Sequence, residues 1–308
     1  MSFVPLPHTL NANGFVPGAT EVPAESWSLK ETPKMDDEQF VLWQSLLEDR
    51  TGMQLSTQRK TFLETSLTMR MREIGYSNYD EYYQRLMNGL AGEVEWATLV
   101  DRLTVQETSF FRHTSSYELV EKYCGEMLAG TEEQLHIDIW SVGCSTGEEP
   151  YSLAMVIDNL IIQQNRQHYF GITATDISLP ALSKGRQAIY GARKVEMIAP
   201  DFRERYFEKL DSNRYQVVPR LRERLCFAQV NVRELDKAPM SDMNIIYCQN
   251  LLIYFRRWRQ REIVSRLIER LAPGGILVLG VGEVIDFDHP LAHRIQHENT
   301  LAFTRRMA

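Results

Sequence analysis

The sequence has 308 residues, of which 44% are hydrophobic and 24% are charged. This composition is typical of globular proteins, and the length suits two domains better than one. The formal net charge of −7 argues against nucleic acid or an anionic membrane surface as the main partner, because both carry negative charge themselves. If the substrate is acidic as well, a local basic patch must bind it.

The sequence also indicates where the protein resides. Its apolar runs are shorter than the roughly 18 residues needed to span a bilayer, and its N-terminal segment has no apolar core of the kind that signal peptides contain. The four cysteines are widely spaced and form no C-x-x-C pair, and the seven histidines do not cluster with them. We therefore expect a cytoplasmic protein with reduced thiols, no metal site and no membrane-inserted segment.

The chain begins with a proline-rich segment over residues 1–35. Its five prolines remove backbone donors and disfavour helix, so this segment is predicted to be a flexible tail. A partner-binding arm around Trp27 is the alternative interpretation.

A helical pattern starts at residue 36. Asp36 or Asp37 is a suitable N-cap, and apolar residues then recur every three or four positions, as on one face of a helix. Gly52 and Gly75 are suitable helix ends, and Asn78 is a suitable start. The spacing predicts a small all-helical domain over residues 36–104, with helices at about 36–51, 57–74 and 78–87 and a fourth that passes through 94–103.

After a linker at about residues 105–120, the apolar period changes to two at Ile137–Val142, which predicts a strand. Alternating strands and helices then favour a parallel sheet covered on both faces, over residues 121–308. A stretch at about 205–225 favours a small antiparallel hairpin inserted in this α/β unit. Further strands are expected at 169–175, 243–247 and 276–279, with a helix at about 256–271 and a turn at Pro273–Gly275.

Polar residues follow the predicted strands at their carboxyl ends, where open α/β sheets bind ligands. Gly143–Pro150 has two glycines that allow a ligand to approach closely, and Glu148 suits an ammonium group or ribose hydroxyls better than a phosphate. Asp176 suits the two hydroxyls of a ribose, although capping of the next helix would also explain it. Asn231 and Gln249–Asn250 carry amides that can bind adenine or an amino-acid group.

These residues belong to five ordered segments that together resemble the CheR family of chemoreceptor methyltransferases, over about residues 36–306. The resemblance implies a class I, Rossmann-like methyltransferase sheet with an inserted small antiparallel β-subdomain, preceded by an all-α domain. The proline-rich extension suggests a member that serves a pilus or other accessory chemosensory system. The five segments are Gln106–Arg112, Ser145–Ser152, Ala174–Ile177, Cys248–Phe255 and Pro273–Gly275.

The resemblance also implies the reaction and the cofactor. The methyl group of S-adenosylmethionine is transferred to glutamate side chains on the cytoplasmic domain of a methyl-accepting chemoreceptor, and S-adenosylhomocysteine is released. Gln106 stands where the family usually has Asn and Gln249 where it usually has Arg; both keep hydrogen-bonding ability, but Gln249 loses a charge. The implied cofactor-binding residues are Gln106, Thr108, Arg112, Glu148, Asp176, Asn231, Val232, Gln249 and Asn250.

Methyl transfer to a glutamate needs few catalytic groups. The carboxylate is already a nucleophile at neutral pH, so no general base is required and most of the rate can come from alignment. Arg112 can hold the carboxylate through its fork of donors, and Tyr254 can place a hydroxyl near the methyl group. A surface salt bridge is the plain alternative for Arg112. Cys144 and Cys248 are not expected to act as nucleophiles.

An acidic receptor needs basic residues where it docks on an acidic enzyme. Arg59 and Arg70 lie on the predicted helix 57–74, and at about 100° per residue they project within roughly 20° of each other. The resemblance implies that this helix docks the receptor. We therefore expect Arg59 and Arg70 to recruit the substrate away from the cofactor, whereas Arg72 points the other way.

Two other functions stay open at this point. The α/β domain would serve equally well in a methyltransferase for a small molecule or another protein side chain, although the helical domain and the hairpin favour a large partner. A cofactor-sensing regulator that has lost catalysis is the second alternative. The presence of both Arg112 and Tyr254 argues against it.

Overall fold

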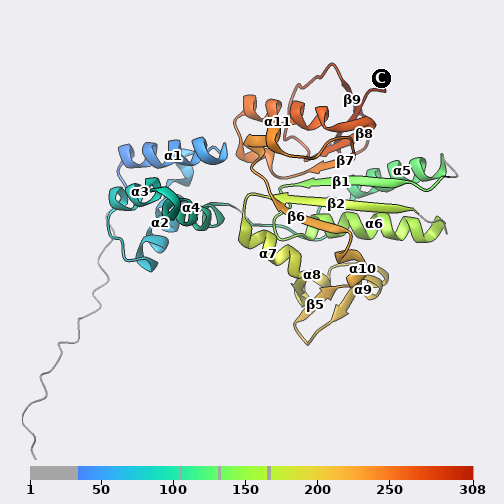
Figure 1. Ribbon diagram of the computed structural model, residues 1–308, viewed down its shortest axis with the longest axis horizontal. Coiled ribbons are helices and arrows are strands. Elements are labelled where there is room, and N and C mark those ends of the chain that lie inside the picture. The colour runs from blue at the N-terminus through green and yellow to red at the C-terminus, as the bar shows by residue number, and fades with distance from the viewer. Residues whose placement is uncertain (1–33, 105, 131–132, 165–167, 308) are drawn as a thin grey trace, which may run out of the picture. The chain divides into compact units, whose positions relative to one another are not determined.

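The computed structural model describes residues 34–104, 106–130, 133–164 and 168–307. Almost all of the predicted tail, Trp27 included, lies outside these residues. Within the described ranges, four helices come first and a seven-stranded sheet with its helices follows (Figure 1).

The helical part starts and ends its first helix as the sequence predicts. Asp36 forms a capping box with Gln39 at the start of α1, and Gly52 ends that helix in the left-handed region with φ of 77°. Asn78 caps α3 through its side chain, as expected. The helices are α1 (Asp37–Thr51), α2 (Lys60–Glu73), α3 (Tyr79–Met87) and α4 (Gly89–Leu103), with a short 3-10 helix η1 (Thr57–Arg59) before α2.

The core of this helical part is aromatic and aliphatic. Trp43 of α1 is buried and stacks on Tyr82 of α3, with ring centroids 5.6 Å apart. Leu63, Leu67 and Met71 form the buried row of α2, which is the periodic apolar face that the sequence predicts.

The large sheet has the strand order β6-β2-β1-β7-β8-β10-β9. The first five strands are parallel, whereas β10 pairs antiparallel with β8 and β9 pairs antiparallel with β10. The expected Rossmann-like α/β class is confirmed, and the two antiparallel strands at one edge add to the predicted parallel sheet. The strands are β1 (His136–Val142), β2 (Tyr169–Asp176), β6 (Leu225–Gln229), β7 (Met243–Cys248), β8 (Leu271–Leu279), β9 (Ala292–Ile295) and β10 (Leu301–Arg305).

Both faces of this sheet are covered, which explains why its central strands are apolar throughout. In β1, Ile137 and Ile139 belong to the core beneath α5 and α6, whereas Trp140 and Val142 belong to the core beneath α11 on the other face (Figure 1). The covering helices are α5 (Thr114–Ala129), α6 (Glu148–Gln164), α7 (Leu179–Gln187) and α11 (Arg257–Glu269).

The predicted turn at Pro273–Gly275 is wrong, because β8 runs through it. The pairing of β8 with β7 shifts register between Met243 and Ile245, and Gly274 takes a positive φ of 78° at this irregularity. A Cβ on Gly275 would lie 2.7 Å from the carbonyl oxygen of Met243. The two glycines therefore serve a bulge in a buried strand, not a turn between elements.

The antiparallel subdomain is present and has one more strand than the predicted hairpin. β4 (Phe207–Lys209) and β5 (Arg214–Val217) form the hairpin around Asp211, whose side chain accepts a hydrogen bond from the Asn213 backbone. The third strand, β3 (Ile189–Gly191), pairs with β5 from far earlier in the chain. Three residues are too few to give a periodic signal. Short helices α8 (Ala192–Val195), α9 (Pro200–Tyr206) and α10 (Pro219–Arg222) complete it.

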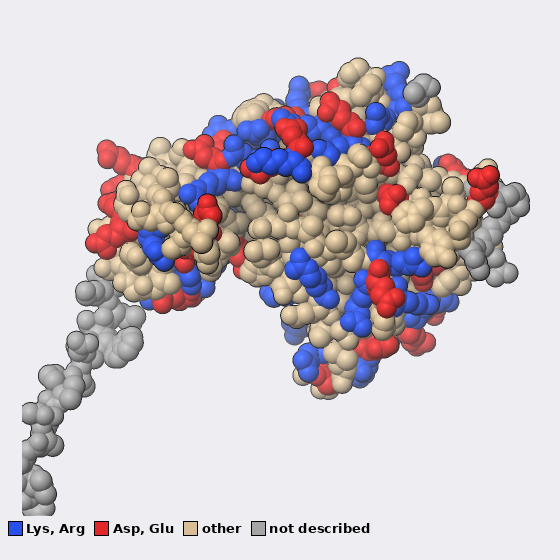
Figure 2. Space-filling model, viewed as in Figure 1, with Lys and Arg blue, Asp and Glu red and all other residues tan. Residues whose placement is uncertain are grey.

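Basic side chains are not spread evenly over the molecule. Figure 2 shows Lys and Arg gathered on the side where α11 lies. The segment 256–270 contains six arginines, of which Arg256, Arg257 and Arg261 are exposed, although the whole chain has a net charge of −7. A local basic surface therefore exists on an acidic protein.

Candidate functional site

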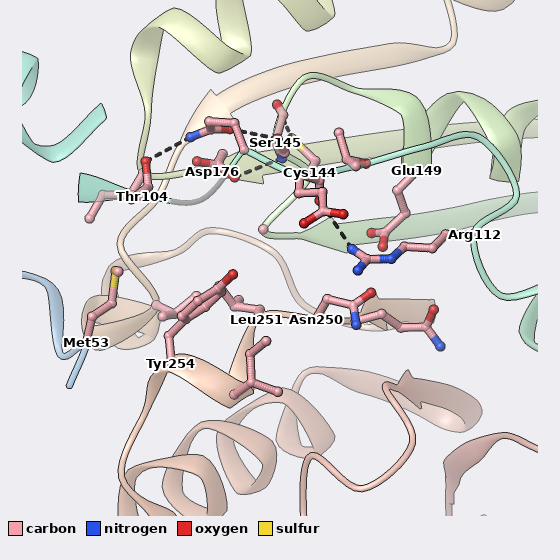
Figure 3. A pocket seen from close by; sticks show the side chains of 18 of the residues that line it. Met53, Thr104, Arg112, Cys144, Ser145, Glu149, Asp176, Asn250, Leu251 and Tyr254 are labelled. Carbon is pink, nitrogen blue, oxygen red and sulfur yellow. Dashed lines mark hydrogen bonds between the residues drawn. The ribbon is translucent and has the colours of Figure 1, made fainter. Parts of the chain in front are cut away.

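A cleft of about 1240 Å³, part of it open to solvent, lies at the carboxyl ends of the parallel strands. The loops after β1, β2 and β7 form its walls, and the strand order reverses at β1, which is where α/β sheets bind ligands. Figure 3 shows Asp176 and Ser145 on one side, Tyr254 and Asn250 on the other, and Arg112 next to Glu149.

The backbone of the loops around this cleft is strained. Phe111, Ser145 and Asn250 have positive φ values of 51°, 48° and 57°, a backbone region that residues other than glycine adopt only in a few per cent of cases. Ser145 and Asn250 line the cleft, and Phe111 precedes the cleft residue Arg112. Such strain persists where the surroundings impose it, and it is common at functional sites.

Asp176 lies in the cleft wall at the end of β2. Its Oδ1 accepts a hydrogen bond from the Ser178 backbone at 2.9 Å, and its Oδ2 accepts one from the Ser145 backbone at 2.8 Å. Burial raises the pKa of Asp176, and these backbone donors act against that shift. Ser178 itself caps α7, so Asp176 does more than end a strand: its carboxylate is held rigidly at the cleft and still has free lone pairs.

Of the two adjacent glutamates, Glu149 lines the cleft and Glu148 does not, so the expectation for Glu148 needs correction. The side chain of Glu148 is fully buried, where it accepts a hydrogen bond from Thr146 at 2.6 Å and pairs with Lys194. Adjacent residues on a helix point about 100° apart, so the first turn of α6 turns one glutamate to the β-subdomain and the other to the cleft. The sequence carries no signal that distinguishes the two.

Among the residues that the structure describes, no cation lies within ion-pair distance of Glu149. Its Oε1 accepts a hydrogen bond from the Ser141 hydroxyl at 2.7 Å. Burial raises its pKa to about 8, helped by the neighbouring Glu283 and Asp176, while Ser141 and Arg112 act in the opposite direction. A carboxyl in this state gains from any cation that enters the cleft.

Arg112 and Tyr254, the two predicted catalytic residues, both line the cleft. The Arg112 side chain is exposed and donates to the carbonyl oxygen of Glu107 at 3.2 Å, and no carboxylate of the described residues forms an ion pair with it. Burial raises the pKa of Tyr254, whereas the charges of Arg59 and Arg112 act to lower it. Arg112 is therefore a cation whose fork of donors is available to a ligand.

Of the other predicted cofactor residues, Gln106, Thr108, Val232 and Asn250 line the cleft. Gln106 accepts a hydrogen bond from the Ser145 hydroxyl at 2.7 Å, which joins the linker to the loop after β1. Asn250 lies 3.0 Å from the His113 ring nitrogen. These contacts leave parts of both amides open to a ligand.

Two predicted cofactor residues are occupied by the fold itself. Gln249 donates to Ser116 and to the carbonyl oxygen of Leu279, and its own oxygen accepts from Tyr247. Asn231 donates to the carbonyl oxygen of Arg50 at 2.8 Å and caps the short helix η2 (Val232–Lys237). Both line the cleft, but the amide of Gln249 is buried and almost fully hydrogen-bonded, so its backbone is the better candidate for cofactor contact.

The thiols near the cleft are protonated. Cys144 and Cys248 are buried, and burial raises the pKa of each well above its usual range. A neutral thiol is a poor nucleophile, which agrees with the expectation that neither takes part in the chemistry. In the described part of the chain, no three His, Cys, Asp or Glu side chains are grouped as a metal site would need.

The helical part contributes to the cleft, which sequence reasoning missed. Thr51 and Met53, at the end of α1, line the cleft. The Gln54 backbone donates to the carbonyl oxygen of Tyr254 at 2.7 Å, and Arg256 pairs with Glu48. The segment after α1 therefore holds the loop that carries Tyr254.

Comparisons with known proteins agree with this geometry. The family model described as CheR methyltransferase, SAM binding domain, matches residues 106–300, and the model described as CheR methyltransferase, all-alpha domain, matches residues 38–104. The chain belongs to the CheR methyltransferase family.

Relatives named chemotaxis protein methyltransferase match most of the chain. Chemotaxis protein methyltransferase 2 of Vibrio cholerae is 31% identical over 249 residues, which are 80% of this chain and 85% of the relative. Chemotaxis protein methyltransferase 1 of Pseudomonas aeruginosa is 30% identical over 250 residues, covering 80% of this chain and 90% of the relative. The Escherichia coli chemotaxis protein methyltransferase is 28% identical over 260 residues, covering 83% and 86%. This CheR-family chain is an S-adenosylmethionine-dependent methyltransferase.

The cleft residues suit S-adenosylmethionine. The carboxylate of Asp176 can accept hydrogen bonds from hydroxyl groups, and the buried carboxyl of Glu149, which lacks a cationic partner, favours a ligand that carries positive charge. Val230, Val232 and Leu251 add an apolar wall that suits an aromatic ring. These acceptors and apolar side chains thus match a ligand with hydroxyl groups, a ring and a cationic end.

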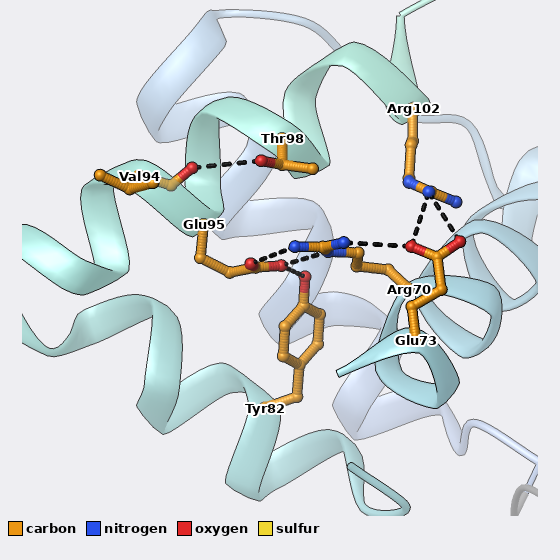
Figure 4. Close-up of polar contacts among 7 residues, drawn as sticks. All are labelled: Arg70, Glu73, Tyr82, Val94, Glu95, Thr98 and Arg102. Atoms are coloured by element: carbon orange, nitrogen blue, oxygen red, sulfur yellow. Dashed lines mark hydrogen bonds and ion pairs between the residues drawn. The ribbon is translucent and has the colours of Figure 1, made fainter. Parts of the chain in front are cut away.

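The predicted docking pair on α2 is not formed. Arg70 donates to both carboxylate oxygens of Glu95, at 2.8 and 2.7 Å, and it also pairs with Glu73 (Figure 4). Arg59 lies in the 3-10 helix before α2, so the α-helical spacing that related it to Arg70 does not apply. Arg59 stacks over Phe62 and has no carboxylate partner in the described chain. Of these two arginines, only Arg59 keeps a charge that no carboxylate of the described residues neutralises.

No helix in the described ranges 34–104, 106–130, 133–164 and 168–307 is both long enough and apolar enough to cross a bilayer.

Proposed function

We propose that this enzyme esterifies glutamate side chains on the cytoplasmic domain of a methyl-accepting chemoreceptor, in the cytoplasm. The observation that carries the proposal is Arg112, an exposed guanidinium in the cleft without a carboxylate partner among the described residues. An arginine in this state binds a carboxylate through two parallel hydrogen bonds, and the acceptor in this reaction is a carboxylate. The names of the relatives, which are chemotaxis methyltransferases, support the same substrate.

In this proposal, the cofactor is held by strand-end residues. S-adenosylmethionine supplies, when bound, a methyl group on a positively charged sulfur that a carboxylate oxygen can attack directly. Asp176 binds hydroxyl groups, and Glu149 takes the position that sequence reasoning gave to Glu148. Both carboxyl groups line the cleft. The remaining contacts come from Gln106, Thr108, Asn231, Val232, Gln249 and Asn250.

The protein's own part in the reaction is alignment. Arg112 holds the acceptor carboxylate, which is ionised at neutral pH and needs no general base. Tyr254 stays protonated, because burial raises its pKa, and its hydroxyl can orient the acceptor from the other wall. Holding two reactants in line in this way accounts for large rate enhancements without acid or base catalysis.

Docking is assigned to Arg59 rather than to the pair on α2. The positive charge of Arg59 acts on Tyr254, so it lies near the cleft, and it is not neutralised by an ion pair. The Arg59→Glu variant is expected to raise KM for the receptor at low salt and to leave cofactor affinity unchanged. Arg72→Glu is the matched control, because Arg72 is exposed on α2 and has no partner in the described chain.

The decisive experiment identifies the bond that is formed. The protein is incubated with S-adenosylmethionine labelled in its methyl group and with a purified cytoplasmic fragment of a chemoreceptor. Glutamyl esters release labelled methanol in mild base, whereas methyl groups on nitrogen do not. Label that stays on the fragment after base treatment would contradict the proposal, and so would the absence of transfer in the presence of several receptors.

A further inference from the structure

A second depression of about 620 Å³ opens beside the cleft. The two share Ile253, whose side chain is 57% exposed, so the depression adjoins the entrance to the cleft. One side is the start of α11 and the other is the loop after β8. We call it the α11 groove; its lining residues are Ile253, Arg257, Gln260, Arg261 and Gly282–Asp286.

The arginines of this groove differ from the other arginines of the same segment. Of the six arginines between residues 256 and 270, four have their charge or donors occupied by the fold. The Arg257 side chain has no hydrogen bond or ion pair in the described chain, and the Arg261 side chain donates only to the carbonyl oxygens of Ile285 and Asp286. The four occupied residues are Arg256 on Glu48, Arg259 on Glu262, Arg266 on Asp236 and Glu262, and Arg270 on three backbone carbonyls.

The groove is apolar as well as basic. Two of its lining residues, Ile253 and Ile285, are 57% and 56% exposed. A lone phosphate or similar anion would gain nothing from these side chains. It would also lie close to the exposed carboxylate of Asp286. A protein segment that has both apolar and acidic side chains fits the combination better.

Glu283 fixes the position of the groove relative to the cleft. This buried carboxylate accepts hydrogen bonds from the backbones of Leu252 and Gly280, at 2.9 and 2.7 Å. It therefore ties the loop that carries Ile253 and Tyr254 to the loop that forms the far side of the groove. A segment bound in the groove is consequently held at a set position relative to the cleft.

We propose that the α11 groove binds the substrate segment next to the target glutamate as a helix, with Arg257 paired to an acidic residue one or two turns away. The proposal rests on the proposed function. A helix presents residues three, four and seven positions apart on one face, at about 1.5 Å per residue along its axis. An acidic residue at such a spacing can pair with Arg257 while apolar neighbours cover Ile253 and Ile285.

The test compares two charge reversals in the full chain. Arg257→Glu is expected to raise KM for a chemoreceptor cytoplasmic fragment about tenfold at low salt, with a smaller change in kcat. Arg294→Glu is the matched control, because Arg294 is exposed on the edge strand β9 and has no partner in the described chain. Affinity for S-adenosylhomocysteine, measured by calorimetry, is expected to be unchanged in both variants, which shows that the cleft is intact.

The outcomes separate the two proposals. If the unaltered chain transfers no methyl group to any receptor fragment, both the proposed function and the proposed role of the groove are contradicted. If it does, and Arg257→Glu keeps a KM within twofold of Arg294→Glu, the groove alone is wrong. A rise in KM that is abolished by high salt supports it, because screening weakens a pairing of exposed charges.

A charge swap tests the geometry. Acidic residues three, four or seven positions from the methylated glutamate are changed singly to Lys in the fragment. With one of these altered fragments, the KM of the Arg257→Glu variant is expected to fall toward the original value. The KM of the Arg59→Glu variant is not expected to fall with the same fragment. If no position restores binding, helix pairing at Arg257 is contradicted.

Discussion

Arginine and glutamate meet in two regions of this molecule, with opposite results. Between the helices α2, α3 and α4, Arg70 pairs with Glu95 and Glu73, and the Tyr82 hydroxyl donates to Glu95 at 2.7 Å (Figure 4). Burial alone would raise the pKa of Glu95, but Arg70 and Tyr82 outweigh it and lower that pKa. In the cleft, Arg112 bonds a carbonyl oxygen and Glu149 bonds a serine.

The difference separates charges that build the fold from charges kept for a ligand. The Arg70 network satisfies its donors and acceptors internally, so it fixes three helices to one another and has little left for a partner. Arg112 and Glu149 lie close enough to influence each other, yet neither forms an ion pair with any described residue. Groups in this state gain most when a substrate or cofactor supplies the missing charge.

The largest effect is expected when Arg112 in the cleft is removed. Arg112→Ala should lower the single-turnover rate of methyl transfer about 100-fold or more, because the acceptor carboxylate loses charged donors. Its melting temperature should stay near that of the unaltered protein, since Arg112 supports no other element. Rapid-quench measurement with labelled methyl donor checks the rate at saturating receptor. A rate within threefold of the original would contradict the role of Arg112.

A change in the Arg70 network should lower the stability of the protein, not the rate of methyl transfer. Glu95→Ala leaves the Tyr82 hydroxyl without its acceptor and Arg70 with Glu73 alone, and we expect a loss of about 2 to 3 kcal/mol in the free energy of unfolding. Urea denaturation measures it. Glu73→Ala is the control, because the Glu73 side chain is 43% exposed and water can replace it, so its effect should be clearly smaller. Equal losses would show that the network does not act as a buried unit.

A smaller effect is expected for the cofactor. Asp176→Ala should weaken binding of S-adenosylhomocysteine by about 1 to 3 kcal/mol, because hydrogen bonds to a charged acceptor are lost. Calorimetry checks this directly. Ser178→Ala removes the cap of α7 and leaves the Asp176 carboxylate in place, so it should change stability more than affinity. Unaltered affinity in a folded Asp176→Ala protein would refute the ribose assignment.

The last expected effect is a dependence of stability on pH. The pKa of Glu149 is raised to about 8 in the folded protein, above the ordinary value near 4.3 of an unfolded chain. Stability is therefore lost as pH rises from about 4.3 through about 8, by at most about 1.4 kcal/mol per pH unit. Glu149→Gln removes this loss, and urea midpoints of the two proteins between pH 5 and pH 8.5 should diverge. Parallel curves would mean that Glu149 is ionised at neutral pH.

Local features of this protein were predictable from the sequence because they depend on neighbouring residues. Asp36 and Asn78 cap helices through their own side chains, and Gly52 ends a helix because it tolerates positive φ. The alternation at Ile137–Val142 predicts a strand, and the alternation of strands with helices predicts that both faces of the sheet are covered, as they are at β1. Polar residues at strand ends predict where the cleft lies, because parallel strands bring those ends to one edge.

Tertiary structure alone decided which of two similar residues serves the cleft. Glu148 and Glu149 are chemically identical neighbours, and the packing of α6 against the β-subdomain decides which one is buried on Lys194 and which one faces the ligand. In the same way, Glu95 lies 25 residues from Arg70, and its approach turns an expected docking residue into part of the fold. The sequence specifies the chemical groups, but the contacts that neutralise some charges and leave Arg112 and Arg257 free come from distant segments of the chain.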